Sequence, residues 1–145
     1  MLVHSDRRHH FPVPRSELWE AIVRVDEYQD WWPWLRSFDG TELKAGMQWQ
    51  CRVQPPLPYS LRMVIDLDEV VAAELVTATV SGDIEGTAAL HLDDAPDGST
   101  ARLVSALAPA NRALKLVARA ALPVVRFGHD WVLDTGARQF RERAL

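Results

Sequence analysis

Apolar and polar residues alternate along much of the chain between Met47 and Leu107, which is the pattern of β-strands that bury one face. The predicted strands span residues 47–53, 61–67, 75–80, 84–92 and 101–107. Gly82-Asp83 and Asp97-Gly98 supply turns between neighbouring strands. The pattern therefore predicts one curved antiparallel sheet with one buried face over residues 47–107.

The two ends of the chain carry other patterns. Residues 2–13 are predicted to form a strand, a helix begins near Pro14 with Ser16 as its N-cap, and a second short helix from Asp26 ends before Pro33. From residue 111 to residue 143 apolar residues recur at helical spacing, and Pro123 is expected to kink or split this long helix. One of the two apolar stripes expected to face the sheet comprises Leu114, Val117, Ala121, Val124, Gly128 and Trp131.

Three segments of the first third of the chain resemble those of a known superfamily. These are Phe11 to Ile22, with a proline five residues before Trp19; Val25 to Pro33, which holds an Asp, a Tyr and a Trp-Pro pair; and Leu43 to Trp49. They are similar to the landmarks of the START-like, or SRPBCC, superfamily, which includes pollen-allergen-like proteins and polyketide cyclases/dehydrases. The resemblance implies one α+β domain over residues 1–145 with the helix-grip (Bet v 1-like) fold: a curved antiparallel sheet, two short helices and a long C-terminal helix.

The resemblance also implies an internal cavity between the sheet and the C-terminal helix, because one helix cannot close a strongly curved sheet. The cavity is expected to be lined by residues of the predicted strands and helix whose side chains point inward. It is expected to bind a hydrophobic or aromatic small molecule or lipid. These ligand-binding residues are Trp34, Trp49, Met63, Leu90, Leu107, Val117, Val125 and His129.

Charge and composition exclude several classes of partner. Lys and Arg number 16 against 20 Asp and Glu, a net charge of −4, so nucleic acid is not an expected partner. The only cysteine is Cys51, which rules out an internal disulfide and favours the cytoplasm. No secretion signal is recognised at the N-terminus, and no apolar run reaches the ~18 residues that span a bilayer. The composition leaves the oligomeric state open.

Motifs for metal, nucleotide or nucleophilic chemistry are absent. The five histidines form no ligand cluster, and neither a phosphate-binding glycine loop nor a Gly-x-Ser-x-Gly sequence occurs, so no metal and no cofactor is expected. Cys51 shares the apolar face of its strand and is predicted to be a buried, inert thiol. Ser105 lies on the inward face of the last strand.

His129 is the one candidate for acid–base catalysis. It belongs to the second apolar stripe of the long helix, so its imidazole is expected to face the sheet. Two interpretations stay open: a core histidine bonded to a backbone carbonyl, which the residues favour, or a cavity group that orients a ligand or moves a proton. Asp130, about 100° away on the helix, is not its expected partner.

Three functions remain open at this point, and whether the chain is an enzyme is undecided. The favoured one is binding of a hydrophobic small molecule, and the second is a polyketide cyclase/dehydrase (aromatase) in which His129 acts as acid or base. The third is a lipid-shuttle or protein-interaction module that uses Trp31, Trp32 and Trp34 as an exposed patch. Whether these tryptophans belong to the core, the cavity rim or an exposed patch stays open. Their exposure in the free protein distinguishes the third function from the other two.

Overall fold

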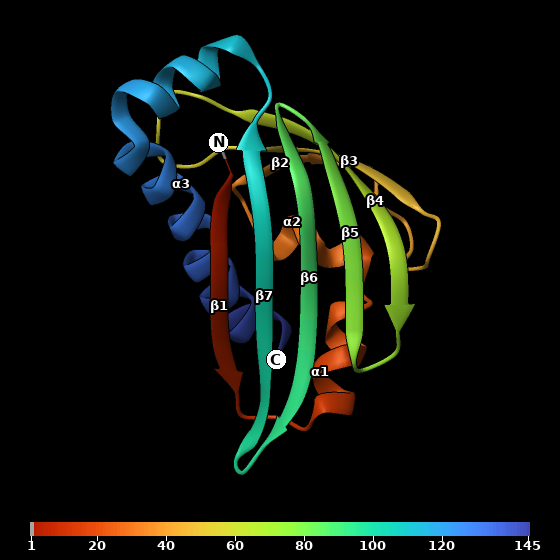
Figure 1. Cartoon of the computed structure of the whole chain (residues 1–145). Coiled ribbons are helices and arrows are strands. Elements are labelled where there is room, and N and C mark those ends of the chain that lie inside the picture. Colours follow the sequence, from red (N-terminus) through yellow and green to blue (C-terminus); the bar gives the residue numbers. More distant parts are fainter. Residues whose placement is uncertain (1) are drawn as a thin grey trace.

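The computed structural model describes residues 2–145 and contains one seven-stranded antiparallel sheet (Figure 1). The strand order is β1-β7-β6-β5-β4-β3-β2, so the first strand of the chain joins the last, with Val3 opposite Leu107. The strands are β1 (Val3–Phe11), β2 (Leu35–Phe38), β3 (Gln48–Val53), β4 (Leu61–Val71), β5 (Leu75–Gly82), β6 (Ile84–Ala95) and β7 (Gly98–Pro109). The predicted antiparallel sheet over residues 47–107 is confirmed.

Two short helical segments connect β1 to β2. The helix α1 (Arg15–Ile22) follows Pro14, and a 3₁₀ turn at Val25–Glu27 leads into α2 (Tyr28–Trp31). The expected N-cap was wrong: Pro14 occupies that position, with no side-chain cap, and Ser16 lies inside α1. Pro33 follows α2 as expected, because its ring disfavours helical backbone at the residue before it.

The long helix α3 (Arg112–Ala144) is kinked. Asn111 caps it, with its side-chain oxygen accepting a hydrogen bond of 2.7 Å from the backbone N–H of Leu114. Ala121 leaves the helical conformation, with φ −150° and ψ 59°, two residues before Pro123. Proline lacks the N–H of the helical ladder, and its ring collides with the preceding turn, which accounts for a break here.

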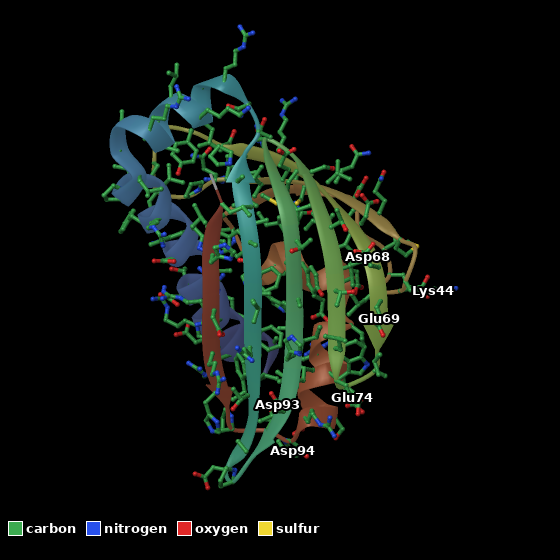
Figure 2. The ribbon with its side chains drawn as sticks, in the orientation of Figure 1. Lys44, Asp68, Glu69, Glu74, Asp93 and Asp94 are labelled. Carbon is green, nitrogen blue, oxygen red and sulfur yellow. The ribbon has the colours of Figure 1, made fainter. Side chains whose placement is uncertain are left out.

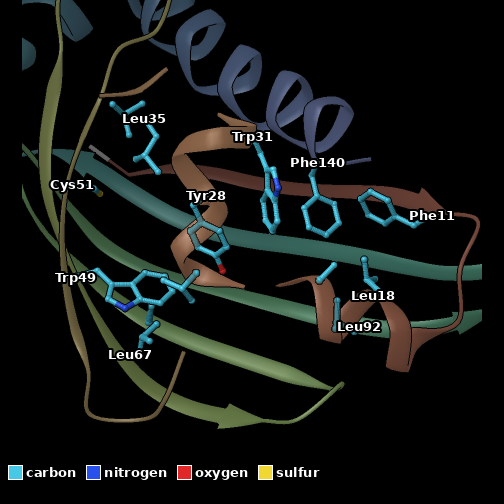
Figure 3. Packing of buried hydrophobic residues seen from close by; sticks show 14 residues of the cluster. Phe11, Leu18, Tyr28, Trp31, Leu35, Trp49, Cys51, Leu67, Leu92 and Phe140 are labelled. Atoms are coloured by element: carbon cyan, nitrogen blue, oxygen red, sulfur yellow. The ribbon is translucent and has the colours of Figure 1, made fainter. Parts of the chain in front are cut away.

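An aromatic cluster joins α3 to the rest of the fold (Figure 3). Phe140 of α3 makes edge-to-face contacts with Phe11 and Trp31, with ring centroids 5.4 and 5.2 Å apart. Tyr28 extends this cluster to Trp49 on β3, at a centroid distance of 5.9 Å. These contacts hold the C-terminal part of α3 and the short helices against one face of the sheet, and the space beside them forms the candidate site.

Candidate functional site

A cavity of about 310 Å³ lies between the sheet and α3. Its walls come from six of the seven strands and from α2, α3 and the connections beside them, and they hold no Asp, Glu, Lys or Arg. Small residues form part of the wall on the side of the sheet, where Ala88 on β6 pairs with Ser105 on β7. The interior is therefore apolar, with a few polar atoms at defined positions.

Six of the eight residues expected to bind a ligand line this cavity. They are Trp34, Trp49, Met63, Leu107, Val125 and His129. Leu90 lies farther along β6 and lines a second cavity of about 260 Å³ instead. The structure places Val117 in neither: it is exposed, because Leu114 and Ala118 are the residues that α3 buries before the kink.

The second cavity adjoins the first, and the two share part of their walls. Phe11, Leu18 and Phe140 line its far side. The shared residues are Tyr28, Trp32, Trp34, Leu103, Val132 and Leu133. A ligand longer than the first cavity therefore meets aromatic and branched side chains rather than backbone at the boundary.

The tryptophan cluster is core and cavity wall, and not an exposed patch. Trp31 is fully buried. Trp32 stacks on Trp34 with ring centroids 5.4 Å apart, and its Nε1 donates to the Gly136 carbonyl at 2.9 Å. The Nε1 of Trp34 donates to Oε1 of Gln139, also at 2.9 Å. With both indole N–H groups bonded to α3, the expected alternative of a free Trp31–Trp34 interaction patch is not supported.

Ser105 is the polar group without a partner. It is 6% exposed, lines the first cavity, and its Oγ is the buried side-chain polar atom left without a hydrogen bond within residues 2–145. Two other polar groups of the lining have partners: the Tyr28 hydroxyl donates to the Ile22 carbonyl at 2.6 Å, and Nε1 of Trp49 donates to the Glu42 carbonyl at 3.1 Å. An unpaired buried hydroxyl normally destabilises a fold, so this one is available to a guest.

Burial keeps the acidic groups of the lining protonated. It raises the pKa of the Cys51 thiol to about 11, with a further contribution from the negative charge of Asp39. Burial also raises the pKa of Tyr28 and that of Tyr59, which is the less deeply buried of the two tyrosines. Because a protonated thiol is a poor nucleophile, Cys51 matches the predicted inert residue.

His129 lines the cavity, but its hydrogen-bond partner is not the expected backbone carbonyl. Its Nδ1 lies 3.2 Å from Oδ1 of Asp130, the residue that sequence reasoning set aside, and not near a backbone carbonyl. The side chain is 24% exposed, which places it at the edge of the cavity rather than in its depth. The pair thus leaves Nε2 as the ring nitrogen without a protein partner in the described part of the chain.

The loop between β3 and β4 covers the cavity next to His129. Its shape is held by Gln54, whose Nε2 donates to the carbonyls of Pro55, Leu57 and Tyr59 at 3.2, 2.9 and 2.7 Å. The loop packs against α3 at Gly128, where a Cβ would come within 2.9 Å of Leu57 and of the Tyr59 hydroxyl. Pro55 of this loop is a lining residue that sequence pattern alone did not identify, because the loop has no period, and Tyr59 lines the cavity as well.

Within residues 2–145, no group of three or more His, Cys, Asp or Glu side chains is arranged to hold a metal ion. None of the helices within this range has the length and apolar character needed to cross a membrane.

Comparison with solved structures decides the fold. The Thermus thermophilus protein TTHA0849 superposes with a TM-score of 0.78 at 9% identity, covering 99% of this chain and 97% of that one. Ara h 8.0201 superposes with a TM-score of 0.71 at 14% identity, covering 99% of this chain and 98% of that one. The chain has the helix-grip fold.

A protein of unknown function from Staphylococcus aureus also superposes on the chain, with a TM-score of 0.69 at 12% identity, covering 98% of this chain and 95% of that one. No family model and no curated protein matches the sequence. At these identities the likeness shows the fold alone, so function is argued from the cavity.

Proposed function

We propose that this chain binds a neutral hydrophobic or aromatic small molecule in the first cavity, between the sheet and α3. The observation that carries the proposal is an apolar chamber of about 310 Å³ whose lining contains no Asp, Glu, Lys or Arg. Small-molecule sites usually occupy ~300–1,000 Å³, so this volume suits a guest of two or three rings. Burial of its apolar surface would supply most of the binding free energy.

The unpaired Ser105 hydroxyl narrows the class of ligand. A guest with one hydroxyl or carbonyl group would give Ser105 Oγ the partner that the free protein lacks. An ionised guest would lose its hydration without gaining a counter-charge from the lining. The proposed ligand is therefore a neutral molecule, lipid or aromatic, with one hydroxyl or carbonyl oxygen that meets Ser105 Oγ.

A titration with 2-naphthol, neutral at pH 7, tests this proposal alongside native mass spectrometry of the freshly purified protein. Ala88→Phe places a ring in the cavity and should weaken 2-naphthol binding at least tenfold. Ala89→Phe is the matched control, because the next residue of a strand points to the opposite face of the sheet. Equal affinity of the wild type and Ala88→Phe, or a bare chain mass together with no binding, contradicts the proposal.

A polyketide cyclase/dehydrase is the second candidate function, and the His129–Asp130 pair favours it. A carboxylate that accepts a hydrogen bond from Nδ1 leaves Nε2 free to take a proton from a keto compound in the cavity. Against it, Tyr28, Cys51 and Tyr59 stay protonated, so His129 would have to act without a second ionised group in the lining.

Substitution of His129 by Phe separates the two functions. If the chain is a binding protein in which His129 has only a structural role, 2-naphthol affinity should change less than threefold. If His129 orients the ligand, affinity falls about tenfold. If it is a general acid or base, turnover of a poly-β-keto thioester should fall by ~10²–10⁴ with affinity nearly retained.

A further inference from the structure

The kinked part of α3 exposes large apolar side chains to solvent. Leu116 is 65% exposed and Phe127 53%, and Val117 and Val124 are exposed beside them. These residues lie on both sides of the break at Ala121, over a stretch of twelve positions. We call the exposed side of residues 112–127 the kink corner.

The kink corner is also cationic. Arg112, Lys115, Arg119 and Arg126 fall within it, and residues 111–129 contain no Asp or Glu, although the chain as a whole carries −4. None of these four cations forms an ion pair with another described residue of the chain. Their charge is thus not neutralised within the molecule.

The apolar and cationic side chains are sorted on the helix surface. Between residues 112 and 120, Leu114 and Ala118 face the interior. At 100° per residue, Leu116 and Val117 then lie on one outer stripe together with Ala113 and Ala120, and the three cations lie on the adjoining stripe. An apolar stripe next to a cationic one is the pattern of a helix that lies at a membrane surface.

Five carboxylates lie away from the kink corner. Glu74, Asp93 and Asp94 lie at the end of the sheet opposite the kink corner, and Asp68 and Glu69 lie along β4 (Figure 2). Three of these carboxylates thus lie at the opposite end of the sheet from the four cations, where Arg15 pairs with Glu74 and Asp94. This separation would orient the molecule with the kink corner toward a negative surface.

We propose that the kink corner docks on an anionic lipid surface. Leu116 and Phe127 would enter the boundary between headgroups and acyl chains while the arginines meet lipid phosphates. This proposal concerns a different surface from the ligand cavity and does not depend on the proposed function. The two are adjacent, since Leu114 and Val125 of the same part of α3 line the cavity.

Co-sedimentation of the full chain with vesicles tests the proposal. Vesicles of phosphatidylcholine and phosphatidylglycerol at 70:30 should bind at least tenfold more protein than pure phosphatidylcholine vesicles. The difference should disappear in 1 M NaCl, because the screening length falls from about 10 Å at 0.1 M to about 3 Å. Equal binding to both vesicles, or to neither, overturns the proposal.

Paired variants assign the binding to this surface. The double variant Leu116→Ser/Phe127→Ser should lower the partition coefficient at least tenfold, and Arg112→Gln/Arg119→Gln should also do so, since each cation near the surface contributes about fivefold. The matched controls Val23→Ser and Arg36→Gln change exposed residues elsewhere and should have no effect.

Circular dichroism melts and 2-naphthol titrations, which should be unchanged, show that each variant is folded and that its cavity is intact. Wild-type vesicle binding by both folded double variants contradicts the assignment. Sedimentation velocity tests whether the chain forms a concentration-dependent dimer. A dimer that the same double variants abolish would show that the kink corner binds a second copy of the chain, and would overturn lipid docking.

Discussion

Removing the Ser105 hydroxyl should change stability and ligand affinity in opposite directions. Because Oγ is buried without a partner, Ser105→Ala should raise the unfolding free energy of the free protein by about 1 kcal/mol. The same change should weaken 2-naphthol binding about fivefold to tenfold, as a lost hydrogen bond does. Urea denaturation and calorimetric titration measure the two effects.

Ser99 provides the control for this prediction. It is also buried, but its Oγ donates to the Val13 carbonyl at 2.8 Å, and it lines neither cavity. Ser99→Ala should therefore lower stability by about 1 kcal/mol and leave 2-naphthol affinity unchanged. If both variants destabilise to the same extent, Ser105 already has a partner and the specificity argument is wrong.

The buried thiol of Cys51 makes stability depend on alkaline pH. Its pKa is raised from 9.0 to about 11 in the folded state, so between these values the unfolded chain loses a proton that the folded chain keeps. The stabilisation is fully present below pH 9 and is lost as pH rises toward 11. At pH 10 the loss from this group is about 1 kcal/mol.

Urea midpoints at pH 8 and pH 10 measure this effect, and Cys51→Val is the reference because it keeps an apolar side chain without a titrating group. The raised pKa of Tyr28 acts in the same direction at higher pH and is present in both proteins. An equal pH dependence in the wild type and Cys51→Val would show that the thiol does not titrate as proposed.

At the scale of elements, β6 and β7 approach so closely at Gly86 that no side chain fits. A Cβ at Gly86, with φ +149°, would lie 1.9 Å from the backbone oxygen of Ala106. Gly86→Ala should therefore cost about 3 kcal/mol or more, because neighbouring strands must separate.

Gly46→Ala is the reference for the backbone strain alone. Gly46 also has a positive φ, +88°, but a Cβ there meets nothing within 4 Å. The expected cost is about 1–2 kcal/mol. Denaturation midpoints of the two variants that coincide would contradict the steric argument at Gly86.

Sequence periodicity predicted the strands better than the faces of the long helix. Alternation places side chains on one of two faces, so Trp49, Met63 and Leu107 were assigned inward correctly. The stripe containing Val117 and Val124 was drawn across the kink expected at Pro123, with one wide buried face on both sides of it. The kink at Ala121 and the narrow contact through Leu114 and Ala118 leave both valines exposed.

Local pattern also could not locate features that depend on tertiary contacts. Strand β2 has four residues, too few for a period, and is defined by its pairing with β3. The bonds of Trp32 and Trp34 to Gly136 and Gln139 join positions more than a hundred residues apart. His129 was placed at the cavity by its helical phase, but the bond to Asp130 depends on rotamers that sequence does not specify.

At the scale of the whole molecule, the cavity connects nearly every element, since its lining comes from β1, β2, β3, β4, β6, β7, α2 and α3. A ligand that binds only the folded state stabilises it by about 2.7 kcal/mol at a free concentration of 100 Kd. Amides of the central strands, which exchange with solvent mainly through global opening, should then exchange about 100-fold more slowly with 2-naphthol bound.

Residues 112–120 should respond differently in the same experiment. They contact the cavity through Leu114 alone and bury little else, so their amides open locally without unfolding the sheet. Their exchange should be fast in the free protein and nearly unaffected by 2-naphthol. Hydrogen exchange read by mass spectrometry on peptides from 112–120 and from β7 compares the two regions directly. Equal slowing in both would mean that the helix before the kink opens only together with the sheet. It would then behave as part of the cavity wall rather than as a separately mobile surface segment.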